Sequence, residues 1–142
     1  MKKIIYGLLI AMLILGTGFI LTISIVFGDS CANQIVDIKI SPDKNFQAVT
    51  FIRDCGATTG FSTQLSIIKA SATFDKSDEK GNTLIMSDKI GDGLMDENGG
   101  AKIMANWTED NKLVILYDSR TETAKRETEY KDIKIEYGQI EE

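Results

Sequence analysis

One short passage of the chain gathers several side chains that could bind a ligand or a partner. Between residues 53 and 64, two glycines and a cysteine are interspersed with ionic, hydroxyl, amide and aromatic side chains. Hydroxyls and glycine N–H groups can form hydrogen bonds, and an exposed aromatic ring can anchor a partner. The alternative is a turn in which the hydroxyls satisfy the backbone. The candidate binding residues are Arg53, Asp54, Thr58, Thr59, Phe61, Ser62 and Gln64.

Catalytic chemistry has little support in the sequence. The chain contains no histidine, which removes Ser-His-Asp and Cys-His machinery and most zinc sites. It also lacks Gly-x-Ser-x-Gly, P-loop and dinucleotide-binding motifs. Paired carboxylates could run glycoside hydrolysis, but among 21 acidic residues such pairs arise by chance. We therefore expect a protein that is not an enzyme and has no cofactor.

An acidic, glycine-spaced stretch over residues 88–98 raises the question of a Ca²⁺ site. An EF-hand loop needs a glycine at its sixth position and a glutamate at its twelfth. Counted from Asp96, those positions hold Ala101 and Trp107. The EF-hand pattern therefore fails, and we expect a solvated acidic loop with no metal, although a looser site built on carbonyls stays open. The polar residues concerned are Asp88, Asp92, Asp96, Glu97 and Asn98.

The start of the chain predicts a compartment. The 24 residues from Ile4 to Phe27 include no ionisable side chain except Tyr6. A helix over them would be about 36 Å long, against a hydrocarbon core of about 30 Å. Two lysines precede this run and an aspartate follows it, which favours a cytoplasmic N-terminus.

The expected organisation therefore has three parts. Residues 1–3 form a cytoplasmic stub, residues 4–27 form a transmembrane helix that acts as a signal anchor, and residues 28–142 form an extracytoplasmic domain. This is a single-pass protein of the bacterial inner membrane. Two alternatives remain: a signal peptide cleaved near Gly28 or Ser30, and a lipoprotein signal ending at Cys31, although the residues before that cysteine match the lipoprotein pattern poorly.

Cys31 and Cys55 are the two cysteines, and they lie 24 positions apart. Outside the cytoplasm two cysteines most often form a structural disulfide, whereas a redox-active pair normally has Cys-x-x-Cys spacing. We expect a disulfide, which should stabilise the fold by roughly 3 kcal/mol. The alternatives are a lipid on Cys31 with a free Cys55, and a catalytic thiol.

Charge narrows the choice of partners. Beyond the apolar run the chain has 14 basic and 21 acidic residues, a formal charge of −7. Such a domain repels phosphate backbones, so we expect no nucleic acid as a partner. No cluster of basic residues in the sequence favours docking on anionic lipid.

Period-two alternation of apolar residues predicts strands that would position these side chains. Val36, Ile38 and Ile40 share one face and should lie in the core, while Leu113 to Tyr117 is continuously apolar and predicts a strand buried on both faces. Residues 120–129 could be loop, strand edge or a short helix. The remaining strands are expected over residues 46–53, 64–70, 83–86, 101–107 and 133–137.

About seven short strands predict a mainly β fold behind the N-terminal transmembrane helix. We expect a small antiparallel β domain, either a curled sheet or a two-layer sandwich. Asn106-Trp107-Thr108 matches a glycosylation sequon, but its place inside a predicted strand makes a chance match the better interpretation.

Two passages resemble the strand–turn–strand units of periplasmic β-propeller repeats. They are Ser41-Pro42-Asp43-Lys44 with the strand after it, and residues 107–113 leading into Ile115. That family uses Ser-Pro-Asp-Gly turns and builds propellers that bind partners, whereas here Lys44 stands where glycine is usual. The chain has room for about two such units, and a closed propeller needs at least four blades.

The whole pattern resembles more closely an uncharacterised family of small bacterial membrane-anchored or exported proteins. The similarity covers most of residues 31–137, and it includes the Ser-Pro-Asp turn and the Trp107 strand. Its specific part is Asp54-Cys55-Gly56-Ala57-Thr58-Thr59-Gly60-Phe61. This resemblance implies a compartment and a fold, and it brings no activity or ligand.

Together these features predict a membrane-anchored, extracytoplasmic binding or accessory protein. It would span the membrane and contact an envelope protein through residues 53–64. The alternatives are an envelope hydrolase that uses carboxylates, and an immunity-type protein that neutralises a toxin at the membrane. The sequence leaves the oligomeric state open.

Overall fold

The chain divides into two units, Met1–Ser30 and Cys31–Glu142. The computed structural model describes residues 5–7, 10, 12–18, 31–56, 61–75, 83–87 and 92–140, with backbone alone at 83, 86 and 87. Each unit is described by itself below.

The first unit corrects the predicted membrane span. Residues 5–7, 10 and 12–18 are helical, but none of the described helical stretches is long and apolar enough to cross a membrane. A span needs about 20 consecutive apolar residues in one helix. The transmembrane helix predicted over residues 4–27 is therefore wrong, and residues 4, 8, 9, 11 and 19–27 of that range lie outside the described part of the chain.

Three further predictions depended on that helix and are also wrong. They are the single-pass, signal-anchor character of the protein, the membrane as a partner that the chain spans, and the placement in the bacterial inner membrane. Each of them rested on a helix of membrane-spanning length, which the described residues do not contain.

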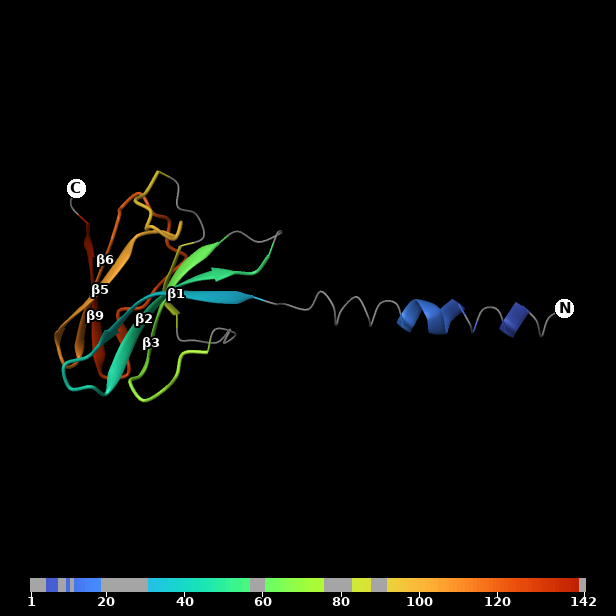
Figure 1. The fold of residues 1–142 in the computed structure, drawn as a ribbon, viewed down its shortest axis with the longest axis horizontal. Helices are drawn as coiled ribbons and strands as arrows, with labels where there is room; N and C mark the ends of the chain where they lie inside the picture. The colour runs from blue at the N-terminus through green and yellow to red at the C-terminus, as the bar shows by residue number, and fades with distance from the viewer. Residues whose placement is uncertain are drawn as a thin grey trace. The chain divides into compact units, whose positions relative to one another are not determined.

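The second unit confirms the mainly β prediction with two sheets (Figure 1). One sheet has the strand order β1-β2-β3-β4-β7, and the other has the order β5-β6-β9-β8. The strands are β1 (Ala32–Ile40), β2 (Phe46–Asp54), β3 (Ser62–Lys69), β4 (Thr83–Ser87), β5 (Ile103–Glu109), β6 (Lys112–Tyr117), β7 (Lys125–Arg126), β8 (Glu129–Tyr130) and β9 (Ile133–Gln139).

The sequence predicted an antiparallel β domain, but one pair of strands is parallel. β6 and β9 pair in parallel, with Leu113 opposite Ile135. Antiparallel strands can be joined by a tight turn, whereas parallel neighbours need a long crossover connection. The chain between Tyr117 and Ile133 supplies that connection and adds the short strands β7 and β8 on the way. The charged segment over residues 120–129 is therefore built of turns and strand pieces, and it forms no helix.

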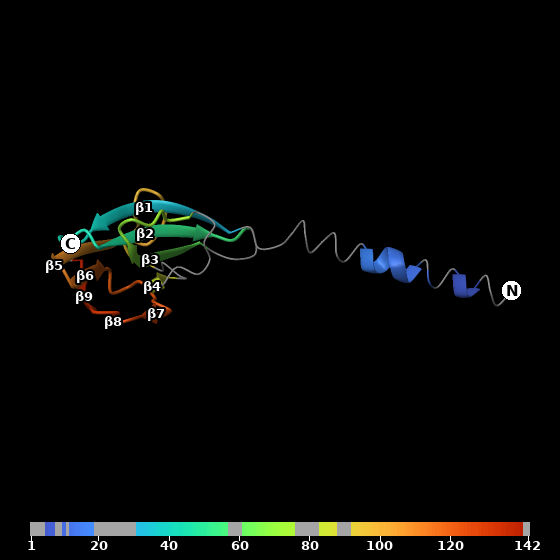
Figure 2. The same cartoon turned by 90° about the horizontal axis from the view of Figure 1, so that it is seen from below.

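The core lies between the two sheets, which face each other as layers (Figure 2). Its buried side chains come from both sheets, and partly buried aromatic rings pack around them. Leu113 and Ile115 of β6 are fully buried, while Val114 and Leu116 are only partly so. The prediction that this strand is buried on both faces is therefore wrong. The buried cluster comprises Ala48, Leu65, Ile67, Leu84, Ile85, Ile103, Ala105, Leu113, Ile115, Ile133 and Ile135.

β1 also departs from its prediction. Ile38 and Ile40 were expected in the core, but 44% and 57% of their surfaces are exposed. β1 is an edge strand, and its register with β2 shifts between Ile35 and Asp37. Ile38 then pairs with Val49, which is outside the buried cluster between the sheets. The register shift interrupts the alternation at Val36, and periodicity by itself could not show what covers the face that carries Ile38 and Ile40.

Specific contacts join the sheets at both sides. Trp107 of β5 donates from Nε1 to the Lys39 carbonyl oxygen of β1 at 2.8 Å. On the other side, the Tyr137 hydroxyl donates to the Glu127 carbonyl oxygen at 2.6 Å, and the Glu127 N–H donates to the Leu84 carbonyl oxygen at 3.2 Å. These bonds hold the two layers in a fixed arrangement.

Candidate functional site

The disulfide fixes one end of the β unit. Cys31 and Cys55 are bonded, with an S–S distance of 2.05 Å and a Cα–Cα distance of 4.0 Å. They follow directly on the Ala32–Asp54 pair, which is the last pair of the β1–β2 ladder. The predicted bridge is thus confirmed. Because the Cys31 sulfur is bonded to Cys55, the alternative of a lipid on Cys31 with a free Cys55 does not fit this structure.

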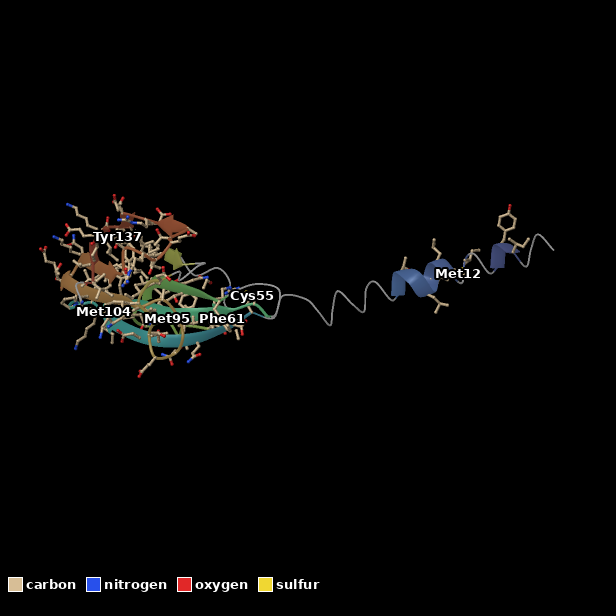
Figure 3. The ribbon with its side chains drawn as sticks, turned by 90° about the horizontal axis from the view of Figure 1, so that it is seen from above. Met12, Cys55, Phe61, Met95, Met104 and Tyr137 are labelled. Carbon is tan, nitrogen blue, oxygen red and sulfur yellow. A yellow bond between two sulfur atoms is a disulfide. The ribbon has the colours of Figure 1, made fainter. Side chains whose placement is uncertain are left out.

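Among the described residues of the predicted site, Phe61 is the one most open to solvent. Its side chain is 59% exposed, immediately before β3 begins at Ser62. Cys55 and Phe61 lie at the same end of the β unit (Figure 3). The cross-strand pair of Arg53 and Ser62 holds β2 and β3 together there. An apolar ring is therefore presented beside a covalently fixed pair of strand ends.

The other described members of the predicted site also take part in local structure. Arg53 donates from Nη1 to the Asn33 side-chain oxygen at 3.2 Å. Asp54 accepts a bond from the Gly56 N–H at 2.8 Å, in a turn where Gly56 has a φ of 91°. Gln64 is buried and donates from its amide nitrogen to the Ser62 hydroxyl at 2.8 Å. Thr58 and Thr59 lie outside the described residues.

The acidic stretch also serves the fold. Asp96 accepts bonds from the N–H groups of Asn98 and Gly100, at 2.8 and 3.0 Å. In the described part of the chain, no group of three or more His, Cys, Asp or Glu residues is arranged to hold a metal ion. Asp88 lies outside that part.

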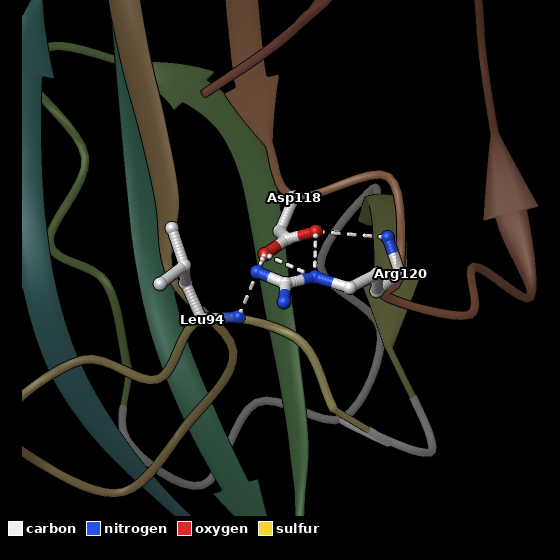
Figure 4. Close-up of polar contacts among 3 residues, drawn as sticks. All are labelled: Leu94, Asp118 and Arg120. Carbon is white, nitrogen blue, oxygen red and sulfur yellow. Dashed lines mark hydrogen bonds and ion pairs between the residues drawn. The ribbon is translucent and has the colours of Figure 1, made fainter. Parts of the chain in front are cut away.

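Asp118 is a carboxylate held by several hydrogen-bond donors (Figure 4). Arg120 donates to both of its oxygens, with Nη2 at 2.6 Å from one of them. The N–H groups of Arg120 and Leu94 donate at 2.9 and 3.0 Å. These hydrogen bonds, foremost those from Arg120, hold the pKa of Asp118 well below its usual range. The clamp ties the segment around Leu94 to the end of β6, a role that no sequence motif indicated.

Asp43 has a lowered pKa for a similar reason. In the Ser-Pro-Asp turn, the Ser41 hydroxyl donates to Asp43 at 2.6 Å and the Asn45 N–H donates at 3.0 Å. These two bonds are the main causes of the lowered pKa. A carboxylic acid that acts as a general acid near neutral pH needs a raised pKa. The lowered pKa values of Asp43 and Asp118 therefore make both carboxyl groups unsuited to the general-acid step of the hydrolase alternative.

A hollow lies at the end of β2 where Phe46 begins the strand, and no motif in the sequence predicted it. It has a volume of about 520 Å³, within the range of small-molecule sites. The one signal in the sequence was Lys44, which stands where such turns usually have glycine. The residues that line the hollow are Lys44, Asn45, Phe46, Lys69 and Ser71.

The fold and these sites together define a small, disulfide-bonded, two-sheet β unit with one exposed aromatic end and one lysine-lined end. No protein-family model matches the chain, and no curated protein or solved structure matches it. The functional argument therefore rests on the geometry.

Proposed function

We propose that this protein is a non-enzymatic binding protein, and that it contacts a protein partner through the end that carries Phe61. The observation behind this proposal is the exposure of that ring, 59% of its surface, next to the Cys31–Cys55 bridge. Interface energy is concentrated in a few large side chains that become buried on binding. Full burial of a phenylalanine contributes about 1.5–3 kcal/mol.

Local rigidity supports the same proposal. The disulfide and the Asp54 turn restrain the end of β2, and the pairing of Arg53 with Ser62 holds the start of β3 against it. A restrained segment loses less conformational entropy when it binds. A partner would therefore meet an apolar contact whose strand ends are already ordered.

The disulfide also supports an oxidising compartment as the place where this protein binds its partner. Disulfides form and persist in oxidising environments and are rare where thiols are kept reduced. We therefore place the proposed activity outside the cytoplasm.

Photocrosslinking in the full, oxidised chain tests the proposal. A benzophenone amino acid replaces Phe61 in one variant and Ile40 in a matched control. Ile40 is 57% exposed and belongs to the same sheet, at the opposite end of β1 from the disulfide. We expect one defined adduct with a protein of the same cells from position 61 and none from position 40.

Substitution to serine then distinguishes a specific contact at Phe61 from non-specific hydrophobic association. Phe61→Ser should abolish capture of that partner by the tagged chain, and Ile40→Ser should leave it unchanged. Equal adducts from both positions, or equal capture by both serine variants, would show that Phe61 is not the contact.

A further inference from the structure

We propose that the hollow beside Phe46 binds a phosphate ester. The hollow has two lysines, an amide, a hydroxyl and one aromatic ring in its lining, with no acidic side chain among them. The chain as a whole carries a formal charge of −5. A lining whose charged side chains are all basic therefore departs from the balance of the rest of the protein.

Strand register brings the central residues of the hollow together. Phe46 and Lys69 are cross-strand partners at the end of the β2–β3 ladder, so their side chains lie on the same face of the sheet. The Ala70 N–H donates to the Asn45 carbonyl oxygen at 2.9 Å and ties the two neighbouring turns together. The Gln47 amide also donates to the Ala72 carbonyl oxygen at 2.8 Å. The rim of the hollow is therefore held in place by the fold.

A third ammonium group, that of Lys131 in a turn of the other sheet, lies near the Phe46 ring. Lys131 lies in the turn between β8 and β9, and its Nζ is 5.5 Å from the centre of the Phe46 ring. The same nitrogen is 5.1 Å from the centre of the Tyr130 ring. Lysines from two turns and from the end of β3 thus lie around one aromatic side chain.

Two of these lysines have an unfavourable backbone conformation. Lys44 has a φ of 60° and Lys131 a φ of 53°, and they are the described non-glycine residues with positive φ. Glycine and asparagine occupy such positions at lower cost, since a side chain crowds the backbone there. Residues kept in strained conformations tend to cluster at ligand sites. Both strained residues here are lysines beside Phe46, which points to a role for their charge.

The arrangement fits a phosphate ester better than a carboxylate. A phosphate monoester carries about −1.5 to −2 charges near neutral pH, which several ammonium groups can balance. Lysine binds phosphate as a compact point charge, and a dianion gains more from several ammonium groups than a carboxylate with its single charge does. Asp43, the nearest acid in the same turn, is occupied by Ser41 and Asn45. The Phe46 ring can contact the carbon group of the ester.

The hollow is separate from the end proposed to contact a partner. Phe46 begins β2 and Asp54 ends it, and at about 3.3 Å per residue the two ends lie roughly 26 Å apart. The phosphate site therefore does not depend on the function proposed for Phe61.

Titration of the full, oxidised chain with phenyl phosphate tests the proposal. At about 20 mM ionic strength, where exposed charges are weakly screened, the amide NMR signals of Phe46 and Lys69 should shift and saturate. Phenol, the neutral counterpart, should leave them in place. Vesicles of phosphatidic acid, compared with phosphatidylcholine, show whether a lipid headgroup rather than a free ester is the source of the phosphate.

Variants assign the binding to the lysines. Lys69→Gln and Lys44→Gly should each weaken binding by about tenfold, as expected for loss of one charged contact. Lys102→Gln, which removes a charge outside the hollow, should change the dissociation constant by less than about twofold. Lys44→Gly also relieves the positive φ, so it should unfold at a higher temperature while binding less.

Because Lys44→Gly is expected to raise the unfolding temperature while it weakens binding, its loss of affinity cannot come from loss of folded protein. The proposal is overturned if neither phenyl phosphate nor phosphatidic acid vesicles shift the signals. An equal loss of affinity in Lys102→Gln would also overturn it, because attraction would then come from overall charge.

Discussion

Asp118 shows how a single residue can organise a loop at a distance. Its oxygens accept bonds from the Arg120 guanidinium and from the N–H groups of Arg120 and Leu94. The residue is only 5% exposed, and an ionised carboxylate with little access to water must be satisfied by such donors. Nothing in the local sequence predicted this clamp, because Leu94 is 24 positions away and contributes only its backbone.

The clamp predicts a pH dependence of stability. Because the folded-state pKa of Asp118 is lowered, its stabilisation is fully present above the ordinary value of 3.8 and is lost as the pH falls below it. Asp118→Asn should therefore be less stable than the wild type at pH 7, and the difference should shrink toward pH 2. Urea unfolding at a series of pH values measures it.

Asp110→Asn provides the control, since Asp110 lies in the exposed turn between β5 and β6. This variant should follow the wild-type curve. A difference between Asp118→Asn and the wild type that stays constant from pH 7 to pH 2 would contradict the assigned ionic role of the carboxylate.

Among the elements, β1 depends most on the disulfide. It is an edge strand paired only with β2 in its sheet, and some of its apolar side chains point to solvent. It therefore gains less from burial than the central strands do. The Cys31–Cys55 bond closes the β1–β2 pair at the end opposite its turn.

Removal of the disulfide should destabilise the protein strongly. For a loop closed over a separation of 24 residues, we expect the double variant Cys31→Ala, Cys55→Ala to lose roughly 3 kcal/mol in free energy of unfolding. Urea unfolding of the variant and of the wild type with and without reductant measures this loss. If the oxidised and reduced wild type unfold at the same urea concentration, the bridge does not stabilise the fold.

The whole β unit depends on one core shared by two sheets. Leu65 and Ile67 come from one sheet and Leu113 and Ile115 from the other, and all four are fully buried in the same cluster. Bonds between the sheets, such as that from Trp107 to the Lys39 carbonyl, add to this contact.

The two sheets should therefore unfold together. Native-state hydrogen exchange should give the amides of Leu65 and Leu113 the same free energy of opening, equal to that of global unfolding. Amides of β1 near its turn are expected to exchange more easily and serve as the internal comparison. Distinct free energies for Leu65 and Leu113 would show that the sheets are separate folding units.

Local patterns in the sequence determined much of the strand content and the disulfide. Alternation located β5 and β9, in which buried residues fall at every second position, whereas β2 and β3 are buried on both faces. The same local signal overestimated the N-terminal run, since hydropathy alone does not establish a continuous helix of membrane-spanning length. It also placed Ile38 and Ile40 in the core, because periodicity groups residues on a face without saying what covers that face.

Only the tertiary structure decided which strands are neighbours and which side chains meet. The parallel β6–β9 pair, the Asp118 clamp and the lysines around Phe46 all join residues far apart in the chain. Such contacts depend on strand order and crossover geometry, which a single sequence does not encode locally. The sequence by itself pointed to Phe61 as an exposed contact, and the fold added the lysine-lined hollow at the other end of β2.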